Sequence, residues 1–340
     1  MHSSPRRDFL KKAGLFGAAA LVPPFLAGAA PSSLEKVIVG HGDFRYKVDK
    51  SWGQLDPQRQ PLMHCHEMVT DDRGRLLCST VSQHFNVLAY NKDGKLQDSW
   101  QLNLTEPHGL SIAGEGKAQT IWLTDSAEGR VINLDLDGRV IRELMVPEDQ
   151  IPEGKQFKPT ETAVAANGDI YVADGYGTNL IFHFDDKGHL RNVFGGLDHF
   201  NCCHGIAVDD RRGKEELLIT SRANQEFQRW STDGRHLATR KLPGLQVCRP
   251  VIKGDNTFFA VIVSESWWSY DGMVAVLDKN FDVVSLPGGS APRNQTDFTG
   301  VTYDNMTFMN PHDVCPDEDG NLYVPQWFSG RTYPIRLKRI

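Results

Sequence analysis

The chain has 340 residues, a formal charge of −6, 40% hydrophobic residues and 31 glycines. These values are typical of a globular protein with a sizeable core, and the chain is too polar for a series of membrane spans. Because the charge is mild and no long basic run is present, neither nucleic acid nor an anionic membrane surface is favoured as a partner. Small molecules and peptides remain as expected partners.

The first thirty residues have the pattern of an export signal. Arg6-Arg7 supplies twin arginines, residues 13–26 are apolar, and Ala27-Gly28-Ala29 has the small residues of a cleavage site. We expect residues 1–30 to be a Tat signal peptide that the Tat export machinery reads, and residues 31–340 to form the mature protein, without a membrane span. The expected location is periplasmic or extracellular. A retained anchor and a helix of the fold are the alternatives, and Pro23-Pro24 counts against the helix.

The remaining chain returns to one short pattern at a spacing of roughly 40 to 50 residues. The pattern is a histidine followed by a glycine or an acidic residue and then by an apolar run. Two further copies have threonine and arginine in place of the histidine. The six slots are His66, His108, Thr160, His204, Arg249 and His312. Such self-similarity indicates a repeat architecture.

Each copy continues with strands and tight turns. The third copy is the clearest, because Asn167-Gly168 and Asp186-Lys187-Gly188 separate short segments of high β-propensity. Its strands are expected at 162–165, 170–174, 180–184 and 190–194. Four strands in each of six copies predict an all-β, six-bladed β-propeller.

The last copy is short of one strand. Residues 37–39 and 44–48 alternate in the manner of strands and precede the first slot. We expect an N-terminal strand from this region to close the last blade, because pairing the two chain ends removes an exposed sheet edge. Residues 290–307 are expected to form an extended loop on one face, a place where binding determinants often lie.

Six cysteines in an exported chain raise the question of disulfides. Cys65, Cys203 and Cys248 each lie one residue before a slot, which favours small buried packing residues over bridges. A bridge that involves Cys315 remains an alternative.

The residue that opens the innermost strand of each blade points at the propeller axis. The six slot residues are therefore expected to surround one channel, and four of them are histidines. Three neutral imidazoles with one open position are the ligand set of catalytic zinc, whereas four better suit iron or copper. Imidazoles that only bond to neighbouring backbone are the alternative. His64 competes with His66 for the first slot, and the cysteine before the slot favours His66.

With the blades laid out, the chain resembles NHL-type propellers, and among them the peptidyl-α-hydroxyglycine α-amidating lyases. The segments that carry the resemblance are 107–111, 158–161 with 171–176, 203–207 with 221–224, and 310–314. The resemblance implies a zinc ion held by His108, His204 and His312, a Tyr176 phenolate acting as base, and Arg222 near the substrate. It also implies cleavage of a peptidyl-α-hydroxyglycine into a peptide amide and glyoxylate.

The chain departs from the family pattern in three places. Residues 76–82 contain no arginine, Asn310 replaces a methionine, and His66 occupies the first slot. Arg249 could supply from its slot the positive charge of the missing arginine and pair with a substrate carboxylate. The catalytic candidates are Tyr176, Arg222 and Arg249, and the metal candidates are His66, His108, His204 and His312. The expected cofactor is zinc or another divalent metal such as iron, and calcium is a further candidate.

Three functions follow from this pattern. The first is a metal-dependent carbon–nitrogen lyase acting on a small-molecule or peptide-derived substrate. The second is a non-catalytic NHL-type propeller that binds a protein or peptide through residues 290–307. The third is a redox enzyme in which four histidines hold iron.

Overall fold

A computed structural model describes residues 37–56, 58–59, 62–82, 84–262, 268–303, 306–327 and 333–340. All of these residues belong to one compact unit, residues 35–340. The predicted signal segment and its boundary near residue 30 lie outside the described residues and stay predictions. Within the described ranges, no helix combines the length and apolarity that crossing a membrane requires.

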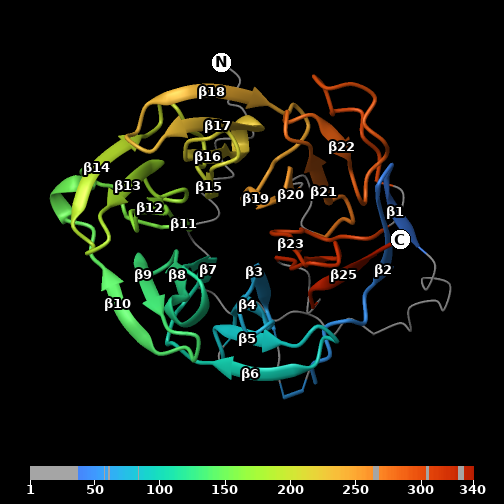
Figure 1. Cartoon of the computed structure of the whole chain (residues 1–340), viewed down its shortest axis with the longest axis horizontal. Helices are drawn as coiled ribbons and strands as arrows, with labels where there is room; N and C mark the ends of the chain where they lie inside the picture. The colour runs from blue at the N-terminus through green and yellow to red at the C-terminus, as the bar shows by residue number, and fades with distance from the viewer. Residues whose placement is uncertain are drawn as a thin grey trace. The chain divides into compact units, whose positions relative to one another are not determined.

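The described strands form six antiparallel sheets arranged as the blades of a six-bladed β-propeller (Figure 1). The all-β prediction is therefore confirmed. In blades 1 to 5 the strands follow one another in chain order from the axis outward, as the short predicted turns require. Among the described residues, short 3₁₀ helices lie between strands at η2 (Gly116–Ala118), η3 (Glu148–Gln150) and η4 (Arg222–Asn224).

The strand bounds of the first three blades are as follows. Blade 1 has β3 (His64–Thr70), β4 (Leu76–Val81), β5 (Val87–Tyr90) and β6 (Leu96–Trp100). Blade 2 has β7 (Pro107–Ala113), β8 (Thr120–Asp125), β9 (Arg130–Leu134) and β10 (Val140–Leu144). Blade 3 has β11 (Glu161–Val164), β12 (Ile170–Ala173), β13 (Leu180–Phe184) and β14 (Leu190–Gly195).

The other three blades complete the propeller. Blade 4 has β15 (Ile206–Asp209), β16 (Glu216–Ser221), β17 (Glu226–Ser231) and β18 (His236–Lys241). Blade 5 has β19 (Val251–Lys253), β20 (Asn256–Val261), β21 (Met273–Leu277) and β22 (Val283–Ser285). Blade 6 has β23 (Cys315–Pro316), β24 (Leu322–Val324) and β25 (Ile335–Arg339), followed by β2 (Phe44–Asp49) and β1 (Ile38–His41).

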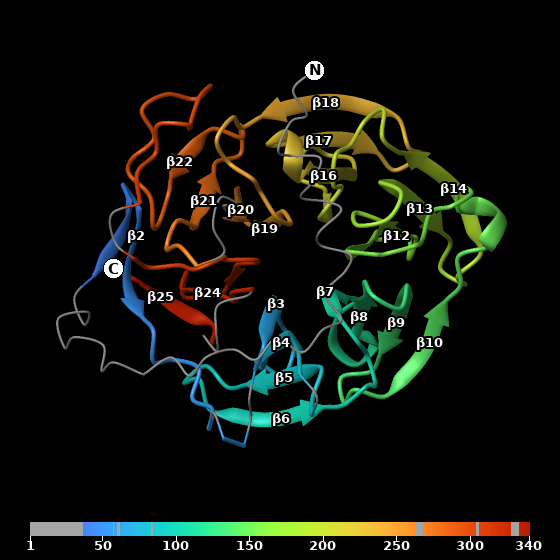
Figure 2. The same ribbon diagram turned by 180° about the vertical axis from the view of Figure 1, so that it is seen from behind.

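Blade 6 is assembled from both ends of the propeller. β2 pairs antiparallel with β25, with Tyr46 opposite Arg339 and Asp49 opposite Arg336, and Arg336 also forms an ion pair with Asp49 at 2.7 Å. In Figures 1 and 2 the blue β2 lies beside the red β25. The predicted closure by an N-terminal strand is confirmed. The sequence predicted one closing strand, whereas the structure adds β1 as a fifth strand outside β2.

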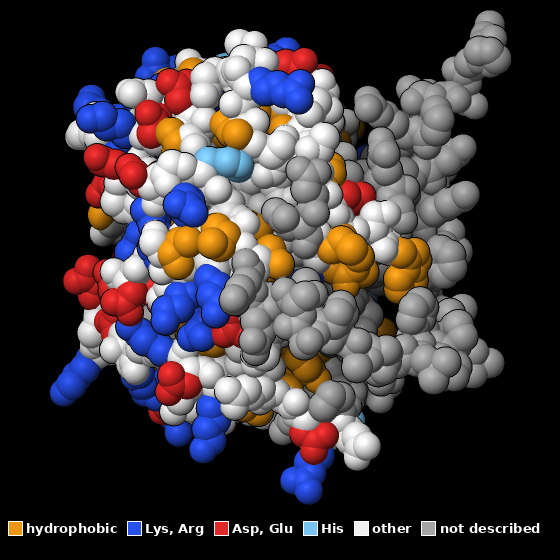
Figure 3. All heavy atoms as spheres, turned by 90° about the vertical axis from the view of Figure 1, so that its right-hand side faces the viewer, with side chains coloured by type: hydrophobic (Ala, Val, Ile, Leu, Met, Phe, Trp, Pro, Cys, Tyr) orange, Lys and Arg blue, Asp and Glu red, His pale blue; other side chains and the backbone are white. Residues whose placement is uncertain are grey.

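The core lies between neighbouring blades. One cluster, for example, joins Leu218 and Phe227 of blade 4 to Phe259 and Ala275 of blade 5. All six cysteines are buried and unpaired, as the packing interpretation predicts, so the Cys315 bridge does not form. On the outside, acidic and basic side chains are interspersed over the face seen in Figure 3, in keeping with the mild formal charge of −6.

The closing strand gives a direct test of this architecture. Tyr46 is fully buried in blade 6, whereas its neighbour Lys47 points outward and is exposed. Replacing a buried aromatic side chain leaves a cavity, so Tyr46→Ala should lower the free energy of unfolding by about 3–5 kcal/mol. Lys47→Ala should change it by less than about 0.5 kcal/mol. Urea unfolding of the two variants measures both values, and equal effects would show that the closing strand contributes little.

Candidate metal centre

The innermost strands bring four imidazoles together at the propeller axis. His66 lies in β3, His108 in β7, His204 just before β15 and His312 just before β23, and none is more than 2% exposed. Ring centroids of adjacent members are 4.6 Å apart for His66–His108, 4.9 Å for His66–His312, 4.9 Å for His108–His204 and 4.8 Å for His204–His312. These four residues are called the histidine cluster below.

In blades 1 and 2, a bulge in the inner strand positions the histidine. In β3 the pairing register shifts between Cys65 and Met68, and in β7 it shifts between Pro107 and Leu110. Two residues then face one on the next strand, a geometry that redirects a side chain. A hydroxyl on that next strand accepts the N–H of the residue after the histidine. The three hydroxyl contacts are Glu67 N to Ser79 (3.0 Å), Gly109 N to Thr124 (2.8 Å) and Gly205 N to Thr220 (2.9 Å).

The glycines after His108 and His204 allow adjacent blades to approach the axis. A Cβ atom on Gly109 would lie 2.4 Å from the carbonyl oxygen of Thr160, and one on Gly205 would lie 2.3 Å from Cα of Arg249. Such contacts are too short for any side chain, which explains the His-Gly pairs in the sequence.

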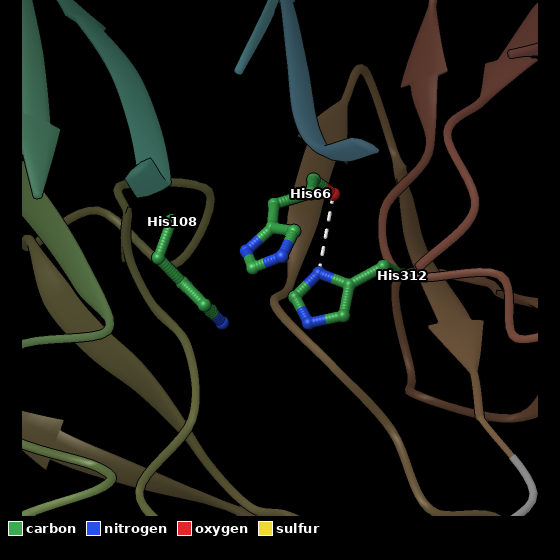
Figure 4. A group of neighbouring side chains, drawn as sticks. All are labelled: His66, His108 and His312. Atoms are coloured by element: carbon green, nitrogen blue, oxygen red, sulfur yellow. Dashed lines mark hydrogen bonds between the residues drawn. The ribbon is translucent and has the colours of Figure 1, made fainter. Parts of the chain in front are cut away.

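Backbone carbonyls orient two of the imidazoles. The Nδ1–H of His108 donates to the carbonyl oxygen of Thr160 at 2.8 Å, and the Nδ1–H of His312 donates to the carbonyl oxygen of His66 at 3.1 Å. Figure 4 shows the second bond and the convergence of His66, His108 and His312. These bonds leave Nε2 with its lone pair in both residues, which is the form that binds a metal.

The other two imidazoles have unused nitrogen atoms. Both ring nitrogens of His66 and Nδ1 of His204 are buried and have no hydrogen-bond partner. An unpaired buried polar atom is costly, so these atoms indicate a missing partner. In the described part of the chain, His66, His108 and His312 form one group that could hold a metal ion, and His204, Cys248 and His312 form another, with ligand atoms within 4.8 Å. The donor set therefore fits a divalent metal.

Burial keeps the cluster neutral. It lowers the pKa of His66, His204 and His312 well below the ordinary 6.5 and that of His108 to about 3, and neighbouring imidazoles and Arg222 lower the pKa of most of them further. Neutral imidazole is the metal-binding form. The cluster is thus ready to bind a metal at neutral pH.

Tyr176 and Arg222 lie against the cluster. The Tyr176 hydroxyl is 3.1 Å from Nε2 of His108 and 3.1 Å from Nε2 of His204, and it accepts a hydrogen bond from Nη2 of Arg222 at 3.3 Å. The Arg222 guanidinium also lies over the Tyr176 ring, 5.5 Å from its centroid. Burial of the hydroxyl raises the pKa of Tyr176, and the charge of Arg222 opposes that rise. The structure therefore brings together two of the three predicted catalytic residues.

Arg249 faces away from this group of residues. Its guanidinium contacts Glu67, Glu161 and Asp313, and all three of its nitrogens are engaged. Its predicted pairing with a substrate carboxylate finds no support in these contacts. Thr160 uses its hydroxyl to bond the carbonyl oxygens of Ala173 and Cys203, and it contributes to the cluster through its own carbonyl.

Two features of the site escaped the sequence interpretation. Cys248 was assigned to packing, although its sulfur groups with His204 and His312. The hydroxyls Ser79, Thr124 and Thr220 occupy equivalent places near the ends of second strands, and an alignment of the repeats on those strands would have revealed them. Of the two candidates for the first slot, His66 joins the cluster, whereas the ring of His64 stacks on that of Trp327 with centroids 5.4 Å apart.

Comparison with known proteins agrees with this geometry. No family model matches the chain. The probable peptidyl-α-hydroxyglycine α-amidating lyase pgal-1 of Caenorhabditis elegans is 36% identical over 291 residues, which cover 80% of this chain and 74% of that protein. The chain belongs to the peptidyl-α-hydroxyglycine α-amidating lyase family.

Other matches are more distant. Peptidyl-α-hydroxyglycine α-amidating lyase 1 of Drosophila melanogaster is 26% identical over 310 residues, covering 83% of this chain but 52% of that protein, so the chain spans about half its length. A solved gluconolactonase from Xanthomonas campestris superimposes with a TM-score of 0.53 at 12% identity over 82% of this chain and 86% of that one. The gluconolactonase likeness shows the shared fold alone.

The histidine cluster predicts metal binding. Protein purified without chelator should contain about one equivalent of a divalent metal, and His108→Ala or His312→Ala should lose at least about nine-tenths of it, because each removes a donor nitrogen. His183→Ala is the matched control, since His183 stacks on Tyr171 and bonds Asp169 in blade 3. Elemental analysis measures the content. Metal retained in both cluster variants would contradict the assignment.

The depressed pKa values predict acid sensitivity of the metal-free protein. The histidines remain neutral in the fold while they protonate near 6.5 in the unfolded chain, so stability is full above pH 6.5 and is lost as pH falls toward about 3. Each buried imidazole can lower the free energy of unfolding by up to about 1.4 kcal/mol for each unit by which the pH falls. His66→Leu should flatten the fall between about pH 6.5 and 5, and His236→Leu, at an exposed position, should not. Chelator-treated samples unfolded in urea across this range measure the slopes, and identical slopes for the three proteins would refute the prediction.

Proposed function

We propose that the chain is a metal-dependent lyase that cleaves a peptidyl-α-hydroxyglycine-like substrate into an amide and glyoxylate. The observation that carries this proposal is the position of the Tyr176 hydroxyl, 3.1 Å from two cluster nitrogens and 3.3 Å from Arg222. The names of the family members supply the reaction class.

The reaction needs acid–base chemistry without an oxidant. The carbinol hydroxyl loses its proton, its carbon–oxygen bond becomes the carbonyl of glyoxylate, and the carbon–nitrogen bond breaks. The departing nitrogen takes a proton and becomes the amide. A positioned group that accepts the first proton and returns one to the nitrogen can serve both steps.

His108, His204 and His312 would hold the metal, and His66 would be a fourth donor. The Nδ1 bonds of His108 and His312 leave the lone pair of Nε2 as the metal-binding atom in these two residues. When bound, the metal supplies a Lewis acid that makes a hydroxyl more acidic.

Tyr176 is the proposed proton carrier. Its hydroxyl is the polar group that faces both the cluster and the guanidinium of Arg222, whose charge stabilises a phenolate. Arg222 is also the cation suited to the carboxylate of the glyoxylate half, because its fork can bind two oxygens at once. Binding that carboxylate would place the carbinol near Tyr176.

A second function has one specific observation in its favour. Both nitrogens of His66 lack a partner, and His66 groups with His108 and His312 as metal donors. Four histidines would suit an iron redox enzyme better than a zinc lyase. Identification of the native metal together with the product assay separates the two: iron without glyoxylate release favours the redox enzyme.

We also propose that the protein is exported. The twin arginines and the following apolar segment support a Tat route to the periplasm or the cell exterior. N-terminal sequencing of protein recovered from each cell fraction tests the route, and a start beyond about residue 29 in the exported fraction is expected.

The assay of the proposed reaction is glyoxylate release from an α-hydroxyglycine compound by metal-loaded protein. Tyr176→Phe should lower kcat by about 10²- to 10⁴-fold, since it removes the proton carrier. Arg222→Gln should chiefly raise KM, by about 10- to 100-fold. The control is Tyr171→Phe, whose hydroxyl bonds the carbonyl of Thr232 away from the cluster. No release by loaded wild type, or full activity of Tyr176→Phe, would overturn the proposal.

A further inference from the structure

Arg249 lies buried next to the axis, and oxygen atoms surround its guanidinium. Nε and Nη2 donate to the two carboxylate oxygens of Asp313 at 2.9 and 2.8 Å. Nη1 lies 3.2 Å from Oε2 of Glu67 and 3.3 Å from Oε2 of Glu161. The side chain of Arg249 is 8% exposed and those of the three carboxylates are 0% exposed.

Two backbone carbonyls complete the arrangement. Nη2 donates to the carbonyl oxygen of Met68 at 2.9 Å, and Nη1 donates to that of Leu110 at 2.7 Å. Two oxygens from Asp313, one from each glutamate and the two carbonyls make six around one cation. We call these atoms the oxygen cage.

The cage has the composition of a site for a hard divalent cation. Calcium takes six to eight oxygens from carboxylates and backbone carbonyls, and the cage supplies six oxygens of these two kinds. A separate observation agrees, because the remaining oxygen of Glu67, Oε1, is buried without a hydrogen-bond partner. The cage thus offers more acceptor capacity than one guanidinium uses.

We propose that the guanidinium of Arg249 is a built-in cation that occupies a divalent-cation site, so that the native chain needs no calcium there. The calcium expected from the sequence does not fit the native protein, because the guanidinium already occupies the cage. Arg249 reaches this point because Gly205, lacking a Cβ, lets blade 4 pack against its backbone.

The built-in cation connects most of the propeller. Its partners come from β3, β7 and β11 and from Asp313, two residues before β23, while Arg249 itself precedes β19. Glu67 and Asp313 directly follow His66 and His312, and Glu161 follows Thr160, whose carbonyl orients His108. Arg249 is therefore a positioning residue for the histidine cluster. This inference does not rest on the proposed lyase reaction and holds whether or not glyoxylate is released.

The test is to remove the guanidinium and offer calcium ions. Arg249→Ala should melt at a lower temperature than wild type in the calcium chelator EGTA, and about 5 mM CaCl₂ should raise its Tm by about 5 °C. Wild type should shift by less than about 1 °C and bind no calcium in a titration. Arg249→Lys, which keeps a charge in the cage, should melt lower than wild type without a calcium response.

Two controls make the result specific. Arg211→Ala is matched, since Arg211 is bound by one carboxylate, Asp209, with the carbonyl of Asp255 and the hydroxyl of Thr257. It should lose stability without gaining a calcium response. Adding Glu67→Gln to Arg249→Ala should abolish the response, and metal bound by the histidine cluster is measured in the same samples.

Each other outcome counts against the proposal. Stoichiometric calcium binding by wild type would show that the cage is not already filled. An Arg249→Ala Tm that is equal in CaCl₂ and EGTA would show that the cage does not accept a divalent ion. If Arg249→Ala is insoluble in EGTA, soluble yield replaces Tm as the readout, and failure of calcium to restore it overturns the proposal.

Discussion

The buried contact between Arg249 and three carboxylates is the interaction on which the axis of this propeller depends. Neighbouring blades bury apolar side chains against one another, but near the axis the inner strands present polar backbone and charged side chains. Charges without solvent are tolerated when they are paired and hydrogen-bonded. By engaging Glu67, Glu161 and Asp313 together, one guanidinium holds the starts of three inner strands at fixed positions.

The histidine cluster adjoins this group of charges, because His66 and His312 directly precede Glu67 and Asp313 in the sequence. Each imidazole comes from a different blade, so no local sequence element fixes the distances between them. They are fixed by the bulges, by hydroxyls such as Thr124 and Thr220, and by glycines that let the blades approach. The result is a group of neutral imidazoles with unpaired nitrogens, an arrangement that costs free energy until a partner binds. Buried polar groups without partners are typical of functional sites. If packing alone had shaped this region, apolar residues would be expected there.

Much of the fold could be predicted from the sequence because a propeller repeats. The slot at His66, His108, His204 and His312 recurs, turns such as Asn167-Gly168 mark the hairpins, and the missing strand of the last copy pointed to the N-terminus. Repetition also placed four histidines at the axis. It could not say where Arg249 points, because a long side chain in a slot can turn toward the histidines or along the axis. The direction of Arg249 depends on carboxylates from three other blades. The grouping of Cys248 with His204 and His312 likewise depends on residues from other blades.

The cluster is asymmetric, and the asymmetry bears on its chemistry. His108 and His312 each contact both His66 and His204, with ring centroids 4.6–4.9 Å apart, and His312 belongs to both groups of residues that could hold a metal. On the His204 side, the Tyr176 hydroxyl contacts both His204 and the guanidinium of Arg222. On the His66 side the imidazole has no partner for either nitrogen. If His108, His204 and His312 alone held a metal, the protein would supply three donors, whereas bonding by His66 as well would supply a fourth. The placement of His66 relative to a bound metal therefore decides whether the site retains room for a substrate oxygen.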